Sequence, residues 1–367
     1  MKYWRGYLVA AIMTLCSWGL TEFAKSHVQL IDMVYPYVDR IVMDYLAAWS
    51  ADFAGCLWQT LLIFGIVLLV GSGVLMLVLR WNPVQWFGWV LAAFYTVSLL
   101  NTGIYGLNQY ATSISEDVRL VYNHYTFDTL ERAALYYRDK ANESVKKVSR
   151  NADGTIRESD FAELNVSAAK GFNTLVYENG YAVFSGTDLP VKQLGFADRY
   201  DGITGKTVGI TGEAAVNPNV PRVGMPFAIC HEMAHRMCVY SDSDADFSAF
   251  LACTANDSPE FIYAGYLMAY RNCYNALAAI GSGESQVVLA KLISGTDDRI
   301  LQDMETYNAF LGDQGTVADT ELTNLLVSWH IQEIARFEDA EEEKQQFDAM
   351  DETHENIRDI INPTEAS

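Results

Sequence analysis

The sequence predicts a mainly α-helical membrane protein, in which N-terminal transmembrane helices precede a helical domain with a small β hairpin or sheet. Hydrophobic residues make up 50% of a chain whose net charge is −21, so apolar and acidic residues must be segregated along it. The long apolar runs lie within the first 105 residues. Most of the later chain repeats apolar residues at helical spacing and contains few strand-like segments.

Three apolar runs are long enough to cross a membrane, which takes about 20 apolar residues. They cover about residues 7–24, 56–79 and 86–105, and the second run contains no charged residue. The first run follows two basic residues and lacks a small-residue cleavage site, which favours an uncleaved anchor over a signal peptide. We therefore assign residues 1–108 to a membrane region whose partner is the lipid bilayer.

The distribution of basic residues predicts how the chain crosses the membrane. Lys2, Arg5 and Arg80 mark one side, whereas residues 25–54 carry more acids than bases. Cytoplasmic segments are enriched in Lys and Arg, which places the N-terminus and the Arg80 turn in the cytoplasm. After three spans, the folded domain that we assign to residues 109–332 is expected outside the cytoplasm of a multi-pass cell-membrane protein.

Spacing and turn residues assign the other segments. Tyr37, Ile41 and Tyr45 follow Pro36 at helical spacing, which predicts an amphipathic helix lying on the membrane or packed on the domain. Residues 172–184 are typical of two short strands around an Asn-Gly turn. The remaining assignments are a helical region at 113–147, a loop with a short strand at 204–216, a helix from about Pro226, helices at 242–253, 260–280, 284–294 and 297–311, and an acidic tail at 333–367 that is helical or disordered.

The chemistry-bearing motif is His231-Glu232-Met233-Ala234-His235. Residues four apart lie on the same face of a helix, so the two imidazoles can point at one metal ion. This HExxH pattern is typical of zinc sites in which the Glu acts as a general base on water held by the metal. The motif has apolar neighbours, and unpaired imidazoles and a carboxylate are costly on a semi-buried face, so a merely solvated helix is the less favoured interpretation.

A hydrolytic zinc site has three protein ligands and one open position, so a third ligand is needed. The next helix offers Asp242, Asp244 and Asp246. Asp242 and Asp246 lie one turn apart and can face the motif together, whereas Asp244 points away and suits a cap or the surface. We favour Asp242 as the ligand, although it can also cap its helix, with Asp246 as support for a histidine ring or as the alternative ligand.

The charge balance and the cysteine positions limit the possible partners and the roles of the thiols. The acidic balance argues against nucleic acid as a partner, because phosphate contacts need clustered Lys and Arg. Cys230, Cys238, Cys253 and Cys273 lie near the motif without CxxC spacing, which disfavours a structural zinc knuckle. A disulfide among them is compatible with an oxidising compartment, and the sequence does not determine the pairing.

Several segments resemble one bacterial family of multi-pass membrane proteins, named domain of unknown function 3810. The similar segments are Pro-Phe with the HExxH motif at 226–235, the acidic helix at 242–253, Tyr-Ala-Gly-Tyr at 263–266, the Gly-rich stretch at 203–217 and Tyr-Gly-Leu-Asn at 105–108. This sequence departs from the family pattern with Asp242 and Asp244, where Glu is expected, and with Cys238, where Gly is usual. A C-terminal Tyr-Leu-Lys element of the family has no clear copy.

The resemblance implies a gluzincin-like zinc-peptidase domain whose substrate is a peptide or protein of unestablished identity. The site would use Glu232 as the catalytic base and hold Zn²⁺ through His231, His235 and Asp242, with Asp246 beside them. Hydrolysis of peptide bonds is the expected function. The alternative is a non-catalytic metal-binding membrane scaffold or sensor with a degenerate peptidase site, and a transporter is disfavoured because only three spans are evident.

Four further residues are candidates for accessory roles. An oxyanion donor is needed for peptide hydrolysis, and Tyr263, Tyr266 or His330 can serve. Glu213 lies in the Gly-rich stretch and is a candidate for shaping the cleft. For each of these residues, packing or turn formation is the competing interpretation.

Overall fold

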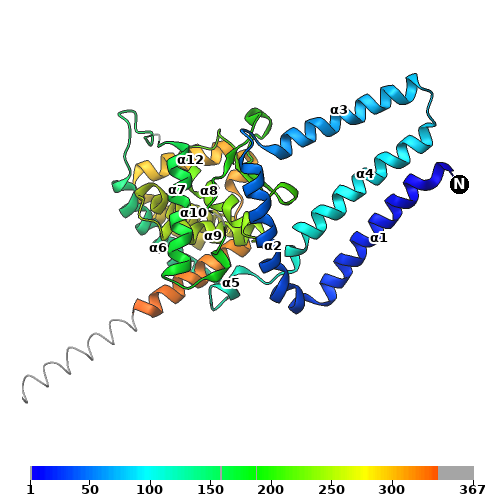
Figure 1. The fold of residues 1–367 in the computed structure, drawn as a ribbon. Coiled ribbons are helices and arrows are strands. Elements are labelled where there is room, and N and C mark those ends of the chain that lie inside the picture. Colours follow the sequence, from blue (N-terminus) through cyan, green and yellow to red (C-terminus); the bar gives the residue numbers. More distant parts are fainter. Residues whose placement is uncertain (1, 158, 187, 338–367) are drawn as a thin grey trace, which may run out of the picture.

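The computed structural model describes residues 2–157, 159–186 and 188–337 and is mainly helical, with one small sheet (Figure 1). Three helices are long and apolar enough to cross a membrane: α1 (Arg5–Ser26), α3 (Leu57–Val78) and α4 (Pro83–Ile104). Each has 22 residues, or about 33 Å at 1.5 Å per residue, which matches the apolar thickness of a bilayer. They coincide with the three predicted runs and indicate a membrane protein.

The three helices enter the folded domain from one side. Figure 1 shows the N-terminus and the turn between α3 and α4 at the end farthest from the domain. In that turn, the Asn82 side chain accepts hydrogen bonds from the first turn of α4, and Pro83 occupies the first helical position. The domain therefore meets the end of α1, the start of α3 and the end of α4.

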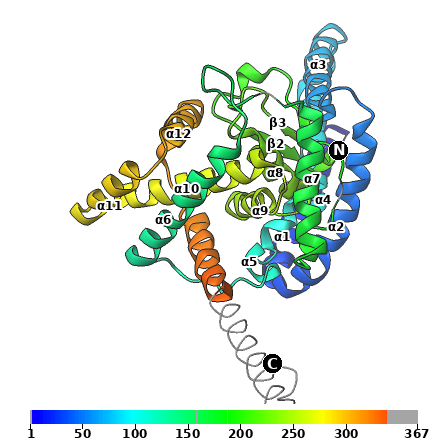
Figure 2. The same ribbon diagram turned by 90° about the vertical axis from the view of Figure 1, so that its left-hand side faces the viewer.

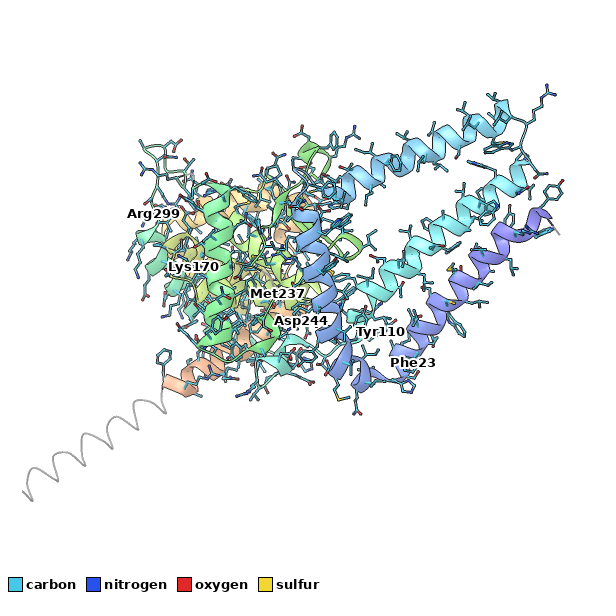
Figure 3. The ribbon with its side chains drawn as sticks, in the orientation of Figure 1. Phe23, Tyr110, Lys170, Met237, Asp244 and Arg299 are labelled. Atoms are coloured by element: carbon cyan, nitrogen blue, oxygen red, sulfur yellow. The ribbon has the colours of Figure 1, made fainter. Side chains whose placement is uncertain are left out.

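Helices α1 and α4 pack closely, whereas α3 stands apart. A Cβ added to Gly6 would lie 2.4 Å from the carbonyl carbon of Gly88, so the two backbones touch where neither has a side chain. The apolar surface of α3 is uncovered by protein along its most hydrophobic window, as expected for a helix surrounded by lipid. Figure 3 places Phe23 near the domain end of α1 and Tyr110 just beyond α4.

Helix α2 (Val28–Ala51) joins α1 to α3 and lies against the domain (Figure 1). The prediction that it begins after Pro36 is wrong, because the helix starts eight residues earlier and includes this proline. Pro36 has no N–H, so one intrahelical hydrogen bond is lost there. The buried face of α2 carries Asp39 and Arg40. The Arg40 guanidinium donates a hydrogen bond of 3.2 Å to the carbonyl oxygen of Ala182.

The domain is built around α8 and α9, with α6 and α7 flanking them (Figure 2). Most of its buried apolar residues form one continuous core that includes both central helices. Its helical elements are η2 (Gly106–Tyr110), α5 (Ile114–Asp117), α6 (Phe127–Ser144), η3 (Val145–Lys147), α7 (Phe161–Tyr177), η4 (Ala182–Phe184), η5 (Ala197–Arg199), η6 (Gly209–Thr211), α8 (Met225–Arg236), α9 (Asp242–Thr254), α10 (Pro259–Ile280), α11 (Gly283–Ser294), α12 (Asp298–Leu311), η7 (Gly312–Thr316) and a last helix from residue 320.

The sheet has the strand order β1-β3-β2, formed by β1 (Lys192–Gln193), β3 (Glu213–Val216) and β2 (Gly205–Val208). β2 runs antiparallel to β3 and is an edge strand. The two strands arise from the Gly-rich stretch in which we predicted a loop and a short strand. Helices α8 to α12 begin and end within a few residues of the predicted positions.

Two predicted elements differ from the structure. Residues 172–184 form no hairpin, because α7 continues to Tyr177 and buries Leu164, Ala168 and Phe172 at helical spacing. Gly180 adopts φ 73°, so the Asn-Gly pair follows a helix end instead of turning a hairpin. The helical region at 113–147 is two helices, α5 and α6, separated by a non-helical stretch.

The acidic tail is described only at its start. The last helix continues through residue 337, where the tail is helical as predicted. The rest of the predicted helical or disordered tail lies outside the described residues.

Candidate metal centre

Helix α8 presents its two motif histidines side by side. The Nε2 atoms of His231 and His235 lie 3.0 Å apart, and their ring centroids are 4.6 Å apart. The surrounding residues of α8 are almost all buried, so the two rings lie in the wall of the domain and not on an open helix face. The four-residue spacing therefore brings two nitrogen lone pairs to one point.

The outer nitrogen of each ring has a protein acceptor. His231 Nδ1 lies 2.6 Å from an Asp246 carboxylate oxygen, and His235 Nδ1 lies 2.7 Å from the carbonyl oxygen of Val239. When both Nδ1 atoms donate to these acceptors, both Nε2 atoms are left as acceptors. Outer hydrogen bonds of this kind orient histidines that bind a metal.

Asp242 completes a cluster of three potential ligand atoms. Its Oδ1 lies 3.3 Å from His235 Nε2, and the three atoms lie within 4.8 Å of one another. Asp242 is the first residue of α9, but the Ser241 side chain caps this helix by accepting from the Asp244 N–H at 3.0 Å. The Asp242 carboxylate is therefore not used as a cap.

The other two carboxylates of α9 differ from Asp242. Asp246 bonds to the outer side of His231, the support position that we favoured for it. Asp244 accepts from the Ser113 hydroxyl at 2.8 Å and is not part of the three-residue cluster. The helical spacing thus places Asp244 on a different side from the other two, but Asp244 is partly buried against Ser113 and Ser241 caps the helix, so its predicted role as a cap or surface acid is wrong.

The donor set fits a zinc ion. Zinc lies about 2.0–2.2 Å from nitrogen and oxygen ligands, so tetrahedral ligand atoms are about 3.3 Å apart. The separations of 3.0 Å between the histidines and 3.3 Å to Asp242 match this value. Two imidazoles with one carboxylate also leave a fourth position, which is the composition of hydrolytic zinc sites.

The carboxylates make the cluster electrostatically receptive to a cation. Burial is the largest single influence on the pKa of His231 and lowers it, but the neighbouring carboxylates, with Asp246 first, together outweigh burial and raise this pKa to about 9. The hydrogen bond to His235 lowers the pKa of Asp242 below its usual value, so this carboxylate is held in its charged form. The first shift shows that the surrounding negative charge stabilises a positive charge at His231, and the second that Asp242 adds to this negative charge.

Glu232 points to strand β2. Its carboxylate is 3% exposed and accepts from the Thr207 hydroxyl at 2.7 Å. A Cβ on Gly205 would lie 2.4 Å from a Glu232 carboxylate oxygen, so the close approach of strand and carboxylate requires glycine at this position. Thr207 was not anticipated, since one threonine in a short strand gives no signal of its contact with α8.

A cavity of about 950 Å³ opens in front of the cluster. Its wall includes His231, Glu232, His235 and Asp242 together with residues of β2, α9 and α10 and of the segment that follows α12. This volume accommodates several residues of an extended peptide. The cluster therefore lies in a cleft that is accessible to a substrate.

Three cavity residues were missed by the sequence reasoning. Arg271 is the only basic residue of α10, which is a signal that we did not use. Its Nε donates to Asn308 at 2.6 Å, and its guanidinium lies over the ring of Tyr307. Tyr105 also lines the cavity, although it directly follows the last span.

The predicted accessory residues lie elsewhere. Tyr263 is fully buried and donates to Asp303 at 2.6 Å, and neither Tyr266 nor His330 lines the metal cavity. Glu213 accepts from the backbone N–H groups of Leu57 and Trp58 at the start of α3. The suggested roles as oxyanion donors and in shaping the cleft are therefore wrong.

The four cysteines near the motif are free and buried. The sulfur atoms of Cys230 and Cys253 are 3.8 Å apart between α8 and α9. Cys238 adopts φ 71°, a left-handed conformation that favours glycine, so a residue with a side chain is strained at this position.

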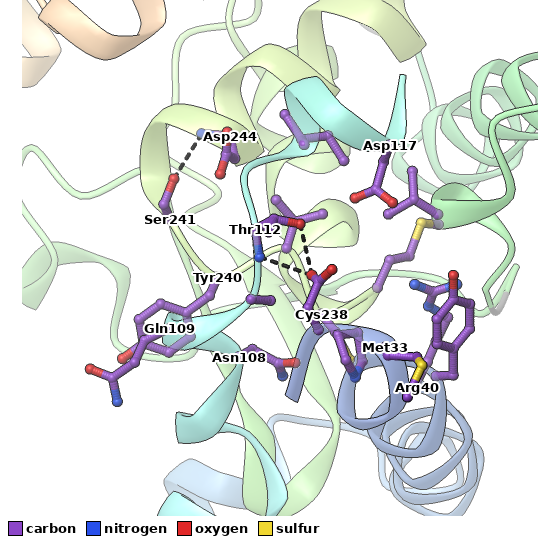
Figure 4. A pocket seen from close by; sticks show the side chains of 18 residues that line it. Met33, Arg40, Asn108, Gln109, Thr112, Asp117, Cys238, Tyr240, Ser241 and Asp244 are labelled. Carbon is purple, nitrogen blue, oxygen red and sulfur yellow. Dashed lines mark hydrogen bonds between the residues drawn. The ribbon is translucent and has the colours of Figure 1, made fainter. Parts of the chain in front are cut away.

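A second cavity of about 340 Å³ lies between α2 and the end of α8 (Figure 4). Gln109, Tyr240 and Ser241 line both cavities, so the second adjoins the metal cleft. Asp39 lies behind it and accepts from the Asn108 amide at 2.5 Å. Burial raises the pKa of Asp39 to about 6.

Fold and site together define a class: a membrane protein whose helical domain carries a His-His-Asp cluster beside a glutamate, with the two histidines in the wall of a cleft and the aspartate exposed. Residues 31–326 match the family described as "Protein of unknown function (DUF3810)", and the chain belongs to this family. The match covers α2, two of the three spans and the whole cluster. No curated protein and no solved structure matches the chain.

Proposed function

We propose that this protein is a membrane-anchored zinc metallopeptidase. The observation that carries the proposal is the convergence of His231 Nε2, His235 Nε2 and Asp242 Oδ1 within 4.8 Å of one another, with His235 Nε2 lying 3.0 Å from the first atom and 3.3 Å from the last. Both outer ring nitrogens have acceptors, and Glu232 lies next in sequence within the same cleft. A chance HExxH helix has no reason to combine these features.

The chain's own residues suit peptide hydrolysis. A zinc ion held by the cluster would act as a Lewis acid, making water a better nucleophile and polarising the scissile carbonyl. Glu232 accepts the proton of the attacking water and delivers it to the leaving amine. The low exposure of Glu232 keeps its carboxylate at the wall of the cleft, and Thr207 holds it there until a substrate enters.

Strand β2 offers a place for an extended substrate. The Asn217 N–H donates a hydrogen bond of 2.8 Å to the Thr204 carbonyl, which continues the ladder between β2 and β3. In an antiparallel pair the bonded positions alternate, so the backbone groups of Gly205 and Thr207 point to the free edge. A peptide that adds to this edge would pass beside Glu232, and backbone pairing gives affinity with little dependence on sequence.

The charge distribution supports an extracytoplasmic site. Lys2, Arg5 and Arg80 are basic residues at the end of the spans that is farthest from the domain (Figure 1). By the positive-inside rule this end is cytoplasmic, and the metal cleft then lies on the other side of the cell membrane.

Zinc content tests the metal centre directly. We expect about one zinc ion per purified wild-type chain and little in the His231→Ala variant, because two ligands hold zinc far less tightly than three. His124→Ala is the matched control, since His124 lies outside the cluster. Equal zinc content in wild type and His231→Ala would contradict the proposal.

A non-catalytic metal-binding scaffold or sensor is the rival function. It is favoured by the hydrogen bond between Glu232 and Thr207, which engages the carboxylate of the expected base. Glu232→Gln separates the two functions, because it removes the base and keeps the metal ligands. A peptidase loses cleavage in this variant while retaining zinc, whereas a scaffold keeps its cellular phenotype.

A further inference from the structure

We propose that the substrate of this centre is the juxtamembrane segment of another membrane-anchored polypeptide, a proposal that rests on the peptidase function above. The structure places the metal cleft where one span ends. Tyr105 directly follows α4 and lines the same cavity as His231, Glu232 and Asp242. The cleft therefore begins at the membrane surface, with no spacer between span and domain.

The edge strand connects this surface to the cluster. At one end of β2, Gly205 touches Glu232. Just beyond the other end, a Cβ on Gly209 would lie 2.3 Å from the Cβ of Tyr105. The two glycines are four residue steps apart in sequence, which corresponds to about 13 Å at 3.3 Å per strand residue. A substrate strand lying along β2 would thus reach the cluster about four to eight residues after leaving the bilayer.

Helix α2 indicates that the domain rests against the bilayer. One residue, His27, separates it from α1, and five residues separate it from α3, so both ends of α2 lie at the membrane surface. Its buried face lies against the domain and mixes apolar residues such as Met43 with the charged pair Asp39 and Arg40. The opposite face exposes apolar side chains at helical spacing: Leu30, Met33, Val34, Tyr37, Val38, Ile41, Tyr45 and Trp49. A helix with this pattern lies in the membrane interface.

This placement favours anchored over soluble substrates. A segment anchored in the same bilayer is confined to the layer next to the site, so its local concentration there exceeds that of a soluble peptide present in the same amount. A soluble peptide gains nothing from a cleft at the membrane surface. The advantage of the anchored segment is greatest for a cleavage site whose distance from its own span equals the short distance from the end of α4 to the cluster along β2.

Sequencing of newly formed protein N-termini tests the inference with native substrates. Membranes and culture fluid are compared between cells that make full-length wild type and cells that make the Glu232→Gln variant. We expect N-termini specific to wild type to lie within about 15 residues of a span, on the domain side. Equal frequency in proteins without a span would overturn the inference and leave the peptidase intact. Absence of any wild-type-specific N-terminus would contradict the peptidase function, and the inference would fall with it.

A reconstituted assay measures the effect of the anchor. Full-length protein in liposomes is given one identified segment in three forms: next to its own span, separated from it by a 20-residue Gly/Ser spacer, and as a free peptide. We expect kcat/KM to be at least tenfold higher for the first form than for the free peptide, with the spacer form between them. Equal values for all three forms would overturn the inference.

Discussion

At the residue scale, the two histidines and Glu232 follow from sequence spacing, whereas their partners depend on tertiary packing. A helix fixes the direction of residues four apart, so the cluster of His231 and His235 could be predicted. Thr207 lies 25 residues from Glu232 in sequence and joins it only because β2 crosses α8. The choice of Tyr263 failed for the same reason, since its hydroxyl is directed at Asp303, 40 residues away.

Asp246 gives the first prediction at this scale. Replacing it with Asn removes the negative acceptor of His231 Nδ1, and loss of such a partner weakens metal binding by about 10- to 100-fold. Asp244→Asn is the control, because it makes the same chemical change on the same helix but next to Ser113. Zinc affinity measured by competition with a chelating dye checks this, and equal weakening in both variants would count against the assigned role.

Asp39 gives a pH-dependent prediction. Its pKa in the folded protein is about 6, above the unfolded value of 3.8, so protonation favours folding. The stabilisation of the folded state by protonated Asp39 is complete below about pH 4 and is lost as the pH rises through 6. Between pH 5 and 8 the loss is about 1–2 kcal/mol. Thermal unfolding should show a lower midpoint for wild type at pH 8 than at pH 5, with a smaller difference in Asp39→Asn.

At the element scale, long periodic helices were predicted well and short segments were not. Helices α8 to α12 each bury a repeating apolar face, so their type and position follow from local pattern. In residues 172–184, the Asn-Gly signal predicted a hairpin turn, but the pair follows the end of a helix there. Both turns need φ above zero, and only packing against the core decides between them.

The edge strand gives a prediction at this scale. Thr207→Pro removes an N–H that points to the free edge and leaves the ladder with β3 intact. We expect kcat/KM for peptide cleavage to fall about tenfold, about what loss of one or two backbone hydrogen bonds causes. Thr207→Val keeps this N–H and loses only the hydroxyl contact to Glu232, so it serves as the control. Equal activity of the two variants would refute substrate pairing along β2.

At the scale of the whole molecule, the central strand of the sheet is joined to a span. Glu213 at the start of β3 accepts from Leu57 and Trp58 of α3 and forms a buried ion pair with Lys192 at 2.8 Å. Its position in the Gly-rich stretch suggested a cleft residue, but the negative charge complements the positive N-terminal end of α3. One carboxylate therefore joins the central strand of the sheet to the start of α3.

Removal of this carboxylate should loosen the junction. Glu213→Ala removes the carboxylate that Lys192 contacts, although three backbone carbonyls still accept from this ammonium, and it leaves two backbone N–H groups without their acceptor, at a cost of about 3–5 kcal/mol. Glu178→Ala at the exposed end of α7 is the control. The apparent unfolding midpoint in detergent should fall clearly for the first variant only. Comparable midpoints would show that other contacts hold the domain on α3.

The exposed position of Asp242 has a consequence for the rate of metal exchange. Its side chain is 87% exposed, whereas those of His231 and His235 are 14% and 10% exposed. A carboxylate in solvent rotates away at little cost, so a bound ion becomes open to attack on that side by an incoming ligand. We expect zinc release to accelerate with chelator concentration, as stopped-flow measurement can show, and a concentration-independent rate would argue against this route. The centre would then follow the zinc supply of its surroundings within seconds to minutes, and not retain the ion for the life of the protein.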